Sequence, residues 1–166
     1  MEITTWQKAE ELTRKWLTED GHSIEEQKDD NANFHFVIDA PPKSHFKQSI
    51  IQPKQTPETV IVVLPVGISQ EHADALRKME QKAREKFVWS VLKVLIFNEN
   101  AYQLERDQEG IPKKVVFTYE LPFDELKKQS LQKAMNLNYR SFLYLIEELR
   151  IELEGVSISD PSEMFG

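Results

Sequence analysis

The sequence predicts an α+β domain in which three helices pack against an antiparallel sheet. Three observations lead to this prediction. Helical and strand-like patterns follow one another in the order α-β-β-β-(β)-α-β-β-α, turn signals separate the strands, and no internal repeat of fixed period occurs. The chain has 166 residues, of which 40% are apolar, so it can bury a sizeable core. We expect a single domain over residues 1–155 and a loose tail over residues 156–166.

The first helix is expected to begin at about Thr5 and to end at Glu19. Thr4 and Gln7 have the spacing of a capping box. Gly21 then supplies the left-handed backbone that commonly follows the last turn of a helix. The side chains of one stripe recur at helical spacing within an arc of roughly 140°. They are Trp6, Ala9, Leu12, Thr13, Trp16 and Leu17.

Four strands are expected between the first and the second helix. A weak strand over residues 22–28 and a strong alternating strand over residues 34–39 form a hairpin around a turn at residues 29–31. Two further strands follow over residues 46–52 and 59–66, separated by a proline-containing turn.

The last of these strands has two unusual features. Its segment 60–64 is apolar on both sides of the pleat, so both of its faces need cover. Pro65 cannot donate a hydrogen bond to a sheet ladder. We therefore expect strand pairing to end or to become irregular at Pro65.

A single second helix is expected from its N-cap Ser69 to Phe97. Residues 87–97 are apolar almost all round, and a helix that exposes so much apolar surface would associate with other molecules. We expect this half of the helix to be buried between layers or against another chain. A hairpin follows, and Asp124 then caps a last helix that keeps its apolar spacing to Gly155.

The composition excludes several classes of function. The net charge of −7, from 21 basic and 28 acidic residues, repels nucleic acids and anionic lipid surfaces. The lack of cysteine excludes disulfides and thiolate metal sites, and it suits a reducing compartment. The N-terminus does not have the pattern of a signal peptide, and no apolar run of about 18 residues occurs. We expect a cytoplasmic protein without a membrane segment, and no cofactor, because the common nucleotide and hydrolase motifs are missing.

Several segments resemble a known family. They read NFHFVI at residues 33–38 followed by Pro41-Pro42, IIQPK at 50–54, VIVV at 60–63 and ISQEH at 68–72. Together they are similar to domain of unknown function family 2299, a family of bacterial and archaeal proteins with a type III secretion chaperone-like, or YbjN-like, fold. The resemblance implies a homodimer. For secretion chaperones it implies binding of an extended segment of a secreted protein over sheet and helix surfaces, and it implies no particular functional residues.

The apolar excess points to a homodimer. Three helices on one sheet face leave the other face open, so some of the apolar surface should meet a second copy or a partner. We predict that Trp89, Leu92 and Ile96 form the dimer interface. The alternative is a monomer whose long helices cover both apolar strips.

Four residues are candidate contacts for a bound protein or peptide segment: Trp6, Trp16, Val60 and Val62. Aromatic side chains dominate binding hot spots, and the two valines belong to the strand that is apolar on both sides. For the tryptophans the alternative is packing of the first helix against the sheet, because both lie on its apolar stripe. The leading hypothesis is a chaperone-like, non-enzymatic interaction module that acts as a homodimer.

An enzymatic alternative stays open. A small hydrolase or transferase could assemble its site only in the fold, with His35 and Asp39 near the mouth of that site. Four residues of strand separate their Cα atoms by about 13 Å, which is too far for a direct hydrogen bond. The four histidines lie on separate elements or loops, so no metal site is predicted.

A second alternative is RNA binding through the basic face of the second helix, where Lys78, Lys82 and Arg84 lie. Acidic residues four positions before Lys78 and Arg84 would form ordinary helix ion pairs with them. These pairs favour a solvated helix face over a binding site.

Overall fold

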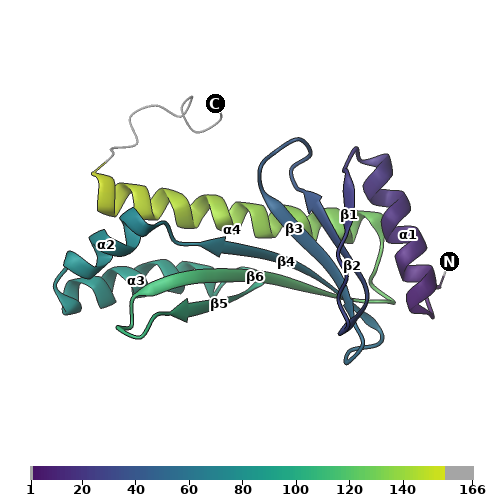
Figure 1. The fold of residues 1–166 in the computed structure, drawn as a ribbon, viewed down its shortest axis with the longest axis horizontal. Helices are drawn as coiled ribbons and strands as arrows, with labels where there is room; N and C mark the ends of the chain where they lie inside the picture. Colours follow the sequence, from purple (N-terminus) through teal and green to yellow (C-terminus); the bar gives the residue numbers. More distant parts are fainter. Residues whose placement is uncertain (1, 156–166) are drawn as a thin grey trace.

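A computed structural model describes residues 2–155 of the chain. Its helices are α1 (Trp6–Glu19), α2 (Gln70–Lys78), α3 (Gln81–Leu95) and α4 (Lys128–Glu154). Its strands are β1 (Ile24–Glu26), β2 (Ala32–Asp39), β3 (Lys47–Pro53), β4 (Thr59–Gly67), β5 (Ala101–Arg106) and β6 (Pro112–Pro122). The strands form one antiparallel sheet in the order β1-β2-β3-β4-β6-β5, and the helices pack on one of its faces (Figure 1). The predicted α+β class is confirmed.

The predicted second helix is in fact two helices, so the described chain has four helices rather than three. Met79, between α2 and α3, has extended backbone angles (φ −67°, ψ 147°), although neither glycine nor proline stands there. The break lets Leu76 and Phe87 enter the same core cluster. The guanidinium group of Arg84 donates to the carbonyl oxygen of Leu76 at the end of α2 (3.4 Å). Tertiary packing therefore overrides a continuous helical pattern.

The expected strand at residues 46–52 is β3, and it lies inside the main sheet. The predicted end of pairing near Pro65 is found on one side of β4 only, because the strand itself continues through Pro65 to Gly67. Its ladder with β3 ends at Val63, whereas its ladder with β6 goes on and places Pro65 opposite Val116. Pro65 thus lies beyond the last β3 pair, at a locally free edge of β4 where its missing N–H removes no ladder bond.

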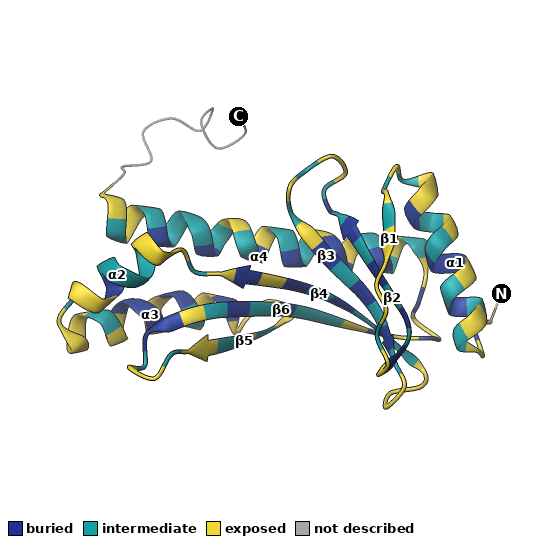
Figure 2. Ribbon diagram, in the orientation of Figure 1, coloured by how far each residue is buried: buried dark blue, intermediate teal, exposed yellow. Residues whose placement is uncertain are grey.

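The buried side chains form two clusters that share α4 (Figure 2). The first cluster joins α1, β2 and the first half of α4, with Leu17 and Phe36 among its most buried members. The second joins α2, α3, β6 and the second half of α4, around Leu76 and Phe117. With 27 residues, α4 is about 40 Å long and so reaches both clusters.

The last helix begins later than predicted. It starts at Lys128, and Asp124 lies in the turn before it rather than at its N-cap. This turn folds Phe123 and Leu126 into the first core cluster, where both are buried. Burial of these two side chains delays the start of α4.

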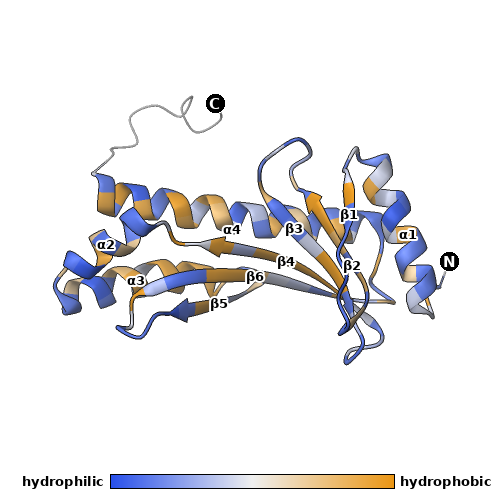
Figure 3. Ribbon diagram, in the orientation of Figure 1, coloured by the Kyte–Doolittle hydropathy of each residue, from blue (hydrophilic) through white to orange (hydrophobic). Residues whose placement is uncertain are grey.

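The sheet face opposite the helices, which we call the open face, has no helix over it within residues 2–155 (Figures 1 and 3). Alternate residues of each strand point to it, and its apolar members are half-buried. They are Val37, Ile51, Ile61, Val63 and Val116. Both faces of segment 60–64 were predicted to need cover. Within residues 2–155 the helices cover one of these faces, and the other belongs to the open face.

None of the helices in the described part of the chain is long and apolar enough to cross a membrane.

Candidate functional site

The second half of α3 and the turn that follows it expose large apolar side chains. Trp89 is 58% exposed, Val94 46%, Ile96 52% and Phe97 85%. We call these four residues the α3 patch. The opposite side of α3 lies in the second core cluster. The segment predicted to be apolar almost all round is therefore buried on one side only.

The α3 patch lies beside a free sheet edge. Trp89, Leu92 and Ile96 recur at helical spacing, and Leu92 packs half-buried against the second core cluster in a groove that Leu104 of β5 also lines. Glu85, one turn before Trp89, approaches Arg106 at the end of β5 (4.0 Å). Among residues 2–155, β5 pairs with β6 alone, so no strand of this part of the chain occupies its other edge. The predicted interface residues therefore adjoin unpaired backbone groups.

The structure places the predicted partner contacts mainly in the core. Val60 and Val62 are completely buried under the helices, so a partner cannot reach them, and the surface of this strand is formed by Ile61 and Val63 instead. Trp6 and Trp16 pack partly buried against the first core cluster, as the packing alternative for these side chains expects.

His35 and Asp39 do not pair with each other, as their spacing along the strand predicts, and each has other partners. Asp39 forms an ion pair with Lys47 (2.7 Å). The Nδ1 atom of His35 lies 3.1 Å from the Oδ2 atom of Asp29, and its Nε2 atom lies 3.0 Å from the Oγ atom of Ser49. Three polar side chains from the β1–β2 turn, β2 and β3 thus meet on the open face.

Sequence reasoning missed this group because it depends on strand register. The turn that contains Asp29 is visible in the sequence, but nothing there shows that β2 and β3 pair with Val37 opposite Ser49. This register brings Ser49 close to His35, which comes 14 residues earlier.

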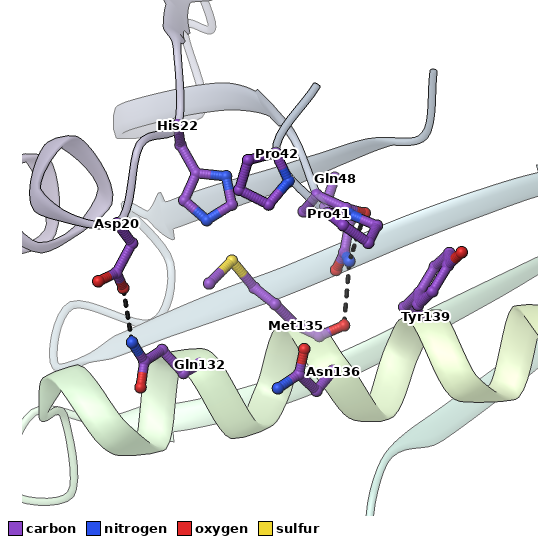
Figure 4. A pocket seen from close by; sticks show the side chains of 10 residues that line it. Asp20, His22, Pro41, Pro42, Gln48, Gln132, Met135, Asn136 and Tyr139 are labelled. Carbon is purple, nitrogen blue, oxygen red and sulfur yellow. Dashed lines mark hydrogen bonds between the residues drawn. The ribbon is translucent and has the colours of Figure 1, made fainter. Parts of the chain in front are cut away.

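A pocket of about 360 Å³ opens between the turn after α1, the loop after β2 and the first half of α4 (Figure 4). Apolar Pro41, Pro42 and Met135 line it together with amide, imidazole and phenol groups. The remaining lining residues are Asp20, His22, Ala40, Gln48, Gln132, Asn136 and Tyr139. Such a mixture suits a small neutral group better than an anion.

Two side chains of the pocket have a defined hydrogen-bonding state. The Nδ1 atom of His22 lies 2.7 Å from the carbonyl oxygen of Asp39, which can only accept, so Nδ1 carries a proton and donates it to this oxygen. Burial disfavours the charge of Asp20, but hydrogen bonds from Gln132 and Lys128 outweigh it and hold the pKa of Asp20 below its ordinary value.

The basic residues of the RNA-binding alternative do not share one helix face. Lys78 ends α2, whereas Lys82 and Arg84 belong to α3 beyond the break. Asp74 pairs with Arg77 rather than with Lys78 (2.8 Å). The break thus removes the geometric basis of a single basic face.

Comparison with known proteins agrees with this architecture. The family model described as "Uncharacterized conserved protein (DUF2299)" matches residues 9–149. An uncharacterized protein from Methanothermobacter thermautotrophicus has a similar structure (TM-score 0.81) and is 27% identical, over 87% of this chain and 99% of that one. YbjN, a putative transcription regulator from E. coli, is similar with a TM-score of 0.50 and 11% identity, over 87% of this chain and 92% of its own. No curated protein matches the chain.

Proposed function

Because this chain belongs to the family of uncharacterized conserved proteins DUF2299, whose description gives no activity, we propose a function from its surface. The protein is a chaperone-like, protein-binding module that acts as a homodimer, and this role requires no catalytic step. The observation that carries the proposal is the α3 patch beside the free edge of β5. The likeness to YbjN supports a shared fold and nothing about its function.

The α3 patch supports the dimer. Monomeric proteins rarely expose contiguous apolar patches larger than a few hundred Å². Burying about 400 Å² of apolar surface would contribute about 10 kcal/mol of gross transfer free energy, which is comparable to the cost of association. In the proposed dimer the α3 patch of one protomer packs against its partner, and the neighbouring, half-buried Leu92 joins Trp89 and Ile96 at the contact.

The open face supports binding of a protein segment. Its half-buried Ile61 and Val63 lie next to polar side chains such as Ser49, a mixture that suits an extended peptide with alternating side chains. A chain without cysteine is suited to a reducing compartment, which supports a role in the cytoplasm.

Suppression of insulin aggregation tests this function. Dithiothreitol breaks the disulfides of insulin and makes its B chain aggregate, and it leaves this cysteine-free protein covalently unchanged. We expect the parent protein to slow the rise in light scattering in proportion to its concentration. The double variant Ile61→Thr, Val63→Thr keeps β-branched side chains in the strand but makes its open face polar, and it should lose most of the suppression.

Leu143→Thr is the matched control, because Leu143 is a partly exposed apolar residue on α4, away from the open face. This variant should suppress aggregation as well as the parent does. Equal suppression by the parent and the double variant would contradict binding on the open face. A parent protein without any effect on insulin would contradict the chaperone-like role.

A further inference from the structure

Asp29, His35 and Ser49 form a continuous series of hydrogen bonds on the open face. Asp29 is held in place by the backbone N–H of Asn31, which donates to its Oδ1 atom (3.0 Å). Its Oδ2 atom meets His35, and the far side of the ring meets Ser49. The side chain of His35 is only 10% exposed, so its orientation is fixed by these contacts.

The chemistry of the three groups determines where the protons are. Hydrogen bonds from the backbone of Asn31 and from His35 hold the pKa of Asp29 below its ordinary value, so the carboxylate is ionised and can only accept. The Nδ1 atom of His35 must therefore carry a proton. In the neutral ring Nε2 is then an acceptor, and the hydroxyl group of Ser49 donates to it. This is the order carboxylate, imidazole and hydroxyl by which a base activates a serine.

The surroundings of Ser49 suit an acyl group. Val37 and Val63 lie directly opposite Ser49 on the neighbouring strands, and Ile51 follows two residues later on the same face. β3 is paired on both sides at Ser49, so the backbone N–H groups nearby lie within the sheet and are not directed at a developing oxyanion. Each missing oxyanion donor costs about 10²–10³-fold in rate.

We propose that Ser49 is a nucleophile that reacts covalently with activated carboxylic esters. The Oγ atom of Ser49 bonds to the carbonyl carbon while its proton moves to the Nε2 atom of His35. The carbon–oxygen bond to the leaving group then breaks, and the departing oxygen takes this proton. The acyl group stays on Ser49 until water hydrolyses it to the carboxylic acid. Because oxyanion donors are missing, we expect each chain to capture one acyl group and to release it slowly. This reaction goes beyond the proposed protein-binding role and does not depend on it.

A fluorophosphonate probe tests the nucleophile, since it reacts with activated serine hydroxyls: the oxygen–phosphorus bond forms as fluoride leaves and the proton passes to the base. We expect the probe to label Ser49, as located by peptide mass spectrometry, in preference to the other serines of the chain. His35→Gln should slow this labelling by about a hundred-fold. p-Nitrophenyl acetate should give a burst of one p-nitrophenolate per chain followed by a slow phase.

Two carboxylate variants distinguish activation from simple exposure of Ser49. Asp29→Asn still accepts from the backbone of Asn31 but presents an amide N–H to His35, which favours the wrong tautomer and should slow labelling more than about tenfold. Asp39→Asn, on the same strand face but paired with Lys47, should leave the rate unchanged. Circular dichroism and melting temperatures verify that the variants are folded. The proposal is overturned if Ser49 of the parent is not labelled, or if His35→Gln is labelled at the parent rate.

Discussion

Asn138 lies on α4 between the two core clusters and is completely buried. Its Nδ2 atom donates to the carbonyl oxygen of Val62 (3.2 Å), and its Oδ1 atom accepts from Asn100 (3.0 Å). Asn100 also donates to the hydroxyl oxygen of Ser141 (3.1 Å). Buried polar groups are costly unless they are satisfied, so this layer fixes how α4 sits on β4 and on the start of β5.

Replacing Asn138 therefore has a large effect on stability. Asn138→Ala leaves buried polar groups without partners and creates a small cavity, so it should lower the free energy of unfolding by about 2–4 kcal/mol. Asn136→Ala, two residues earlier and exposed, should change it by less than about 0.5 kcal/mol. Urea denaturation of both variants measures the difference. Similar midpoints for the two variants would show that the network does not stabilise the fold.

Asp107 makes stability sensitive to acid. Its Oδ1 atom accepts from the backbone N–H groups of Ile111 (2.9 Å) and Glu109 (2.8 Å), and its Oδ2 atom accepts from Arg77 (3.2 Å). These contacts, with that of Ile111 the largest, hold the pKa of Asp107 below its ordinary value. A carboxylate with a lowered pKa stabilises the fold above the unfolded value of about 4, and the contribution is lost as pH falls through the folded value.

Asp107→Asn keeps the Oδ1 acceptor but removes the charge. The parent should melt at a higher temperature than this variant near neutral pH, and the difference should shrink as pH falls toward about 2, where the parent's carboxyl group is protonated. Calorimetry over this pH range measures it. A difference that stays constant down to the lowest pH would rule out titration of Asp107 as its source.

At the scale of elements, boundaries set by local chemistry could be predicted and those set by packing could not. Gly21 follows α1 with a φ of +82°, and Ser69 caps α2 through the backbone N–H of His72 (3.2 Å), both as predicted. The break at Met79 depends on what α2 and α3 pack against, and the sequence carries no glycine or proline to mark it.

At the start of α1 the predicted N-cap is wrong by one residue. The cap is Thr5, whose hydroxyl accepts from the backbone N–H of Lys8 (3.3 Å), and not Thr4 of the predicted capping box. Thr5→Ala should lower the free energy of unfolding by about 1 kcal/mol, because a helix N–H loses its partner. Thr4→Ala is the matched control and should be nearly neutral. Thermal or urea unfolding that shows the larger loss for Thr4→Ala would assign the cap to the other threonine.

The sequence identified the exposed residues of α3 but not those of β4, because the exposed side of a strand depends on which face the helices cover. An all-round apolar helix identifies Trp89 and Ile96 as surface-forming residues, because one helix cannot bury every side on a single sheet. On the strand that is apolar on both sides, Val60 and Val62 could not be told from Ile61 and Val63. The choice between these two sets depends on which face the helices cover.

At the scale of the whole molecule, the helices occupy one sheet face and leave an open face, a free β5 edge and the α3 patch unpartnered within residues 2–155. A homodimer that buries the patch accounts for this distribution of apolar surface. The proposed dimer would present the open faces of two protomers to a protein segment. Loss of the dimer should therefore weaken binding to segments long enough to contact both protomers.

The most direct test of the dimer is the solution mass of the parent and of Trp89→Glu, measured by light scattering across a dilution series. We predict that the parent has twice the mass of one chain at high concentration and that Trp89→Glu is a folded monomer, because the carboxylate would be buried without a partner at the contact. Leu143→Glu, an exposed apolar position outside the α3 patch, should remain dimeric. A parent that is monomeric at every concentration, or a Trp89→Glu variant that stays dimeric, would contradict the account.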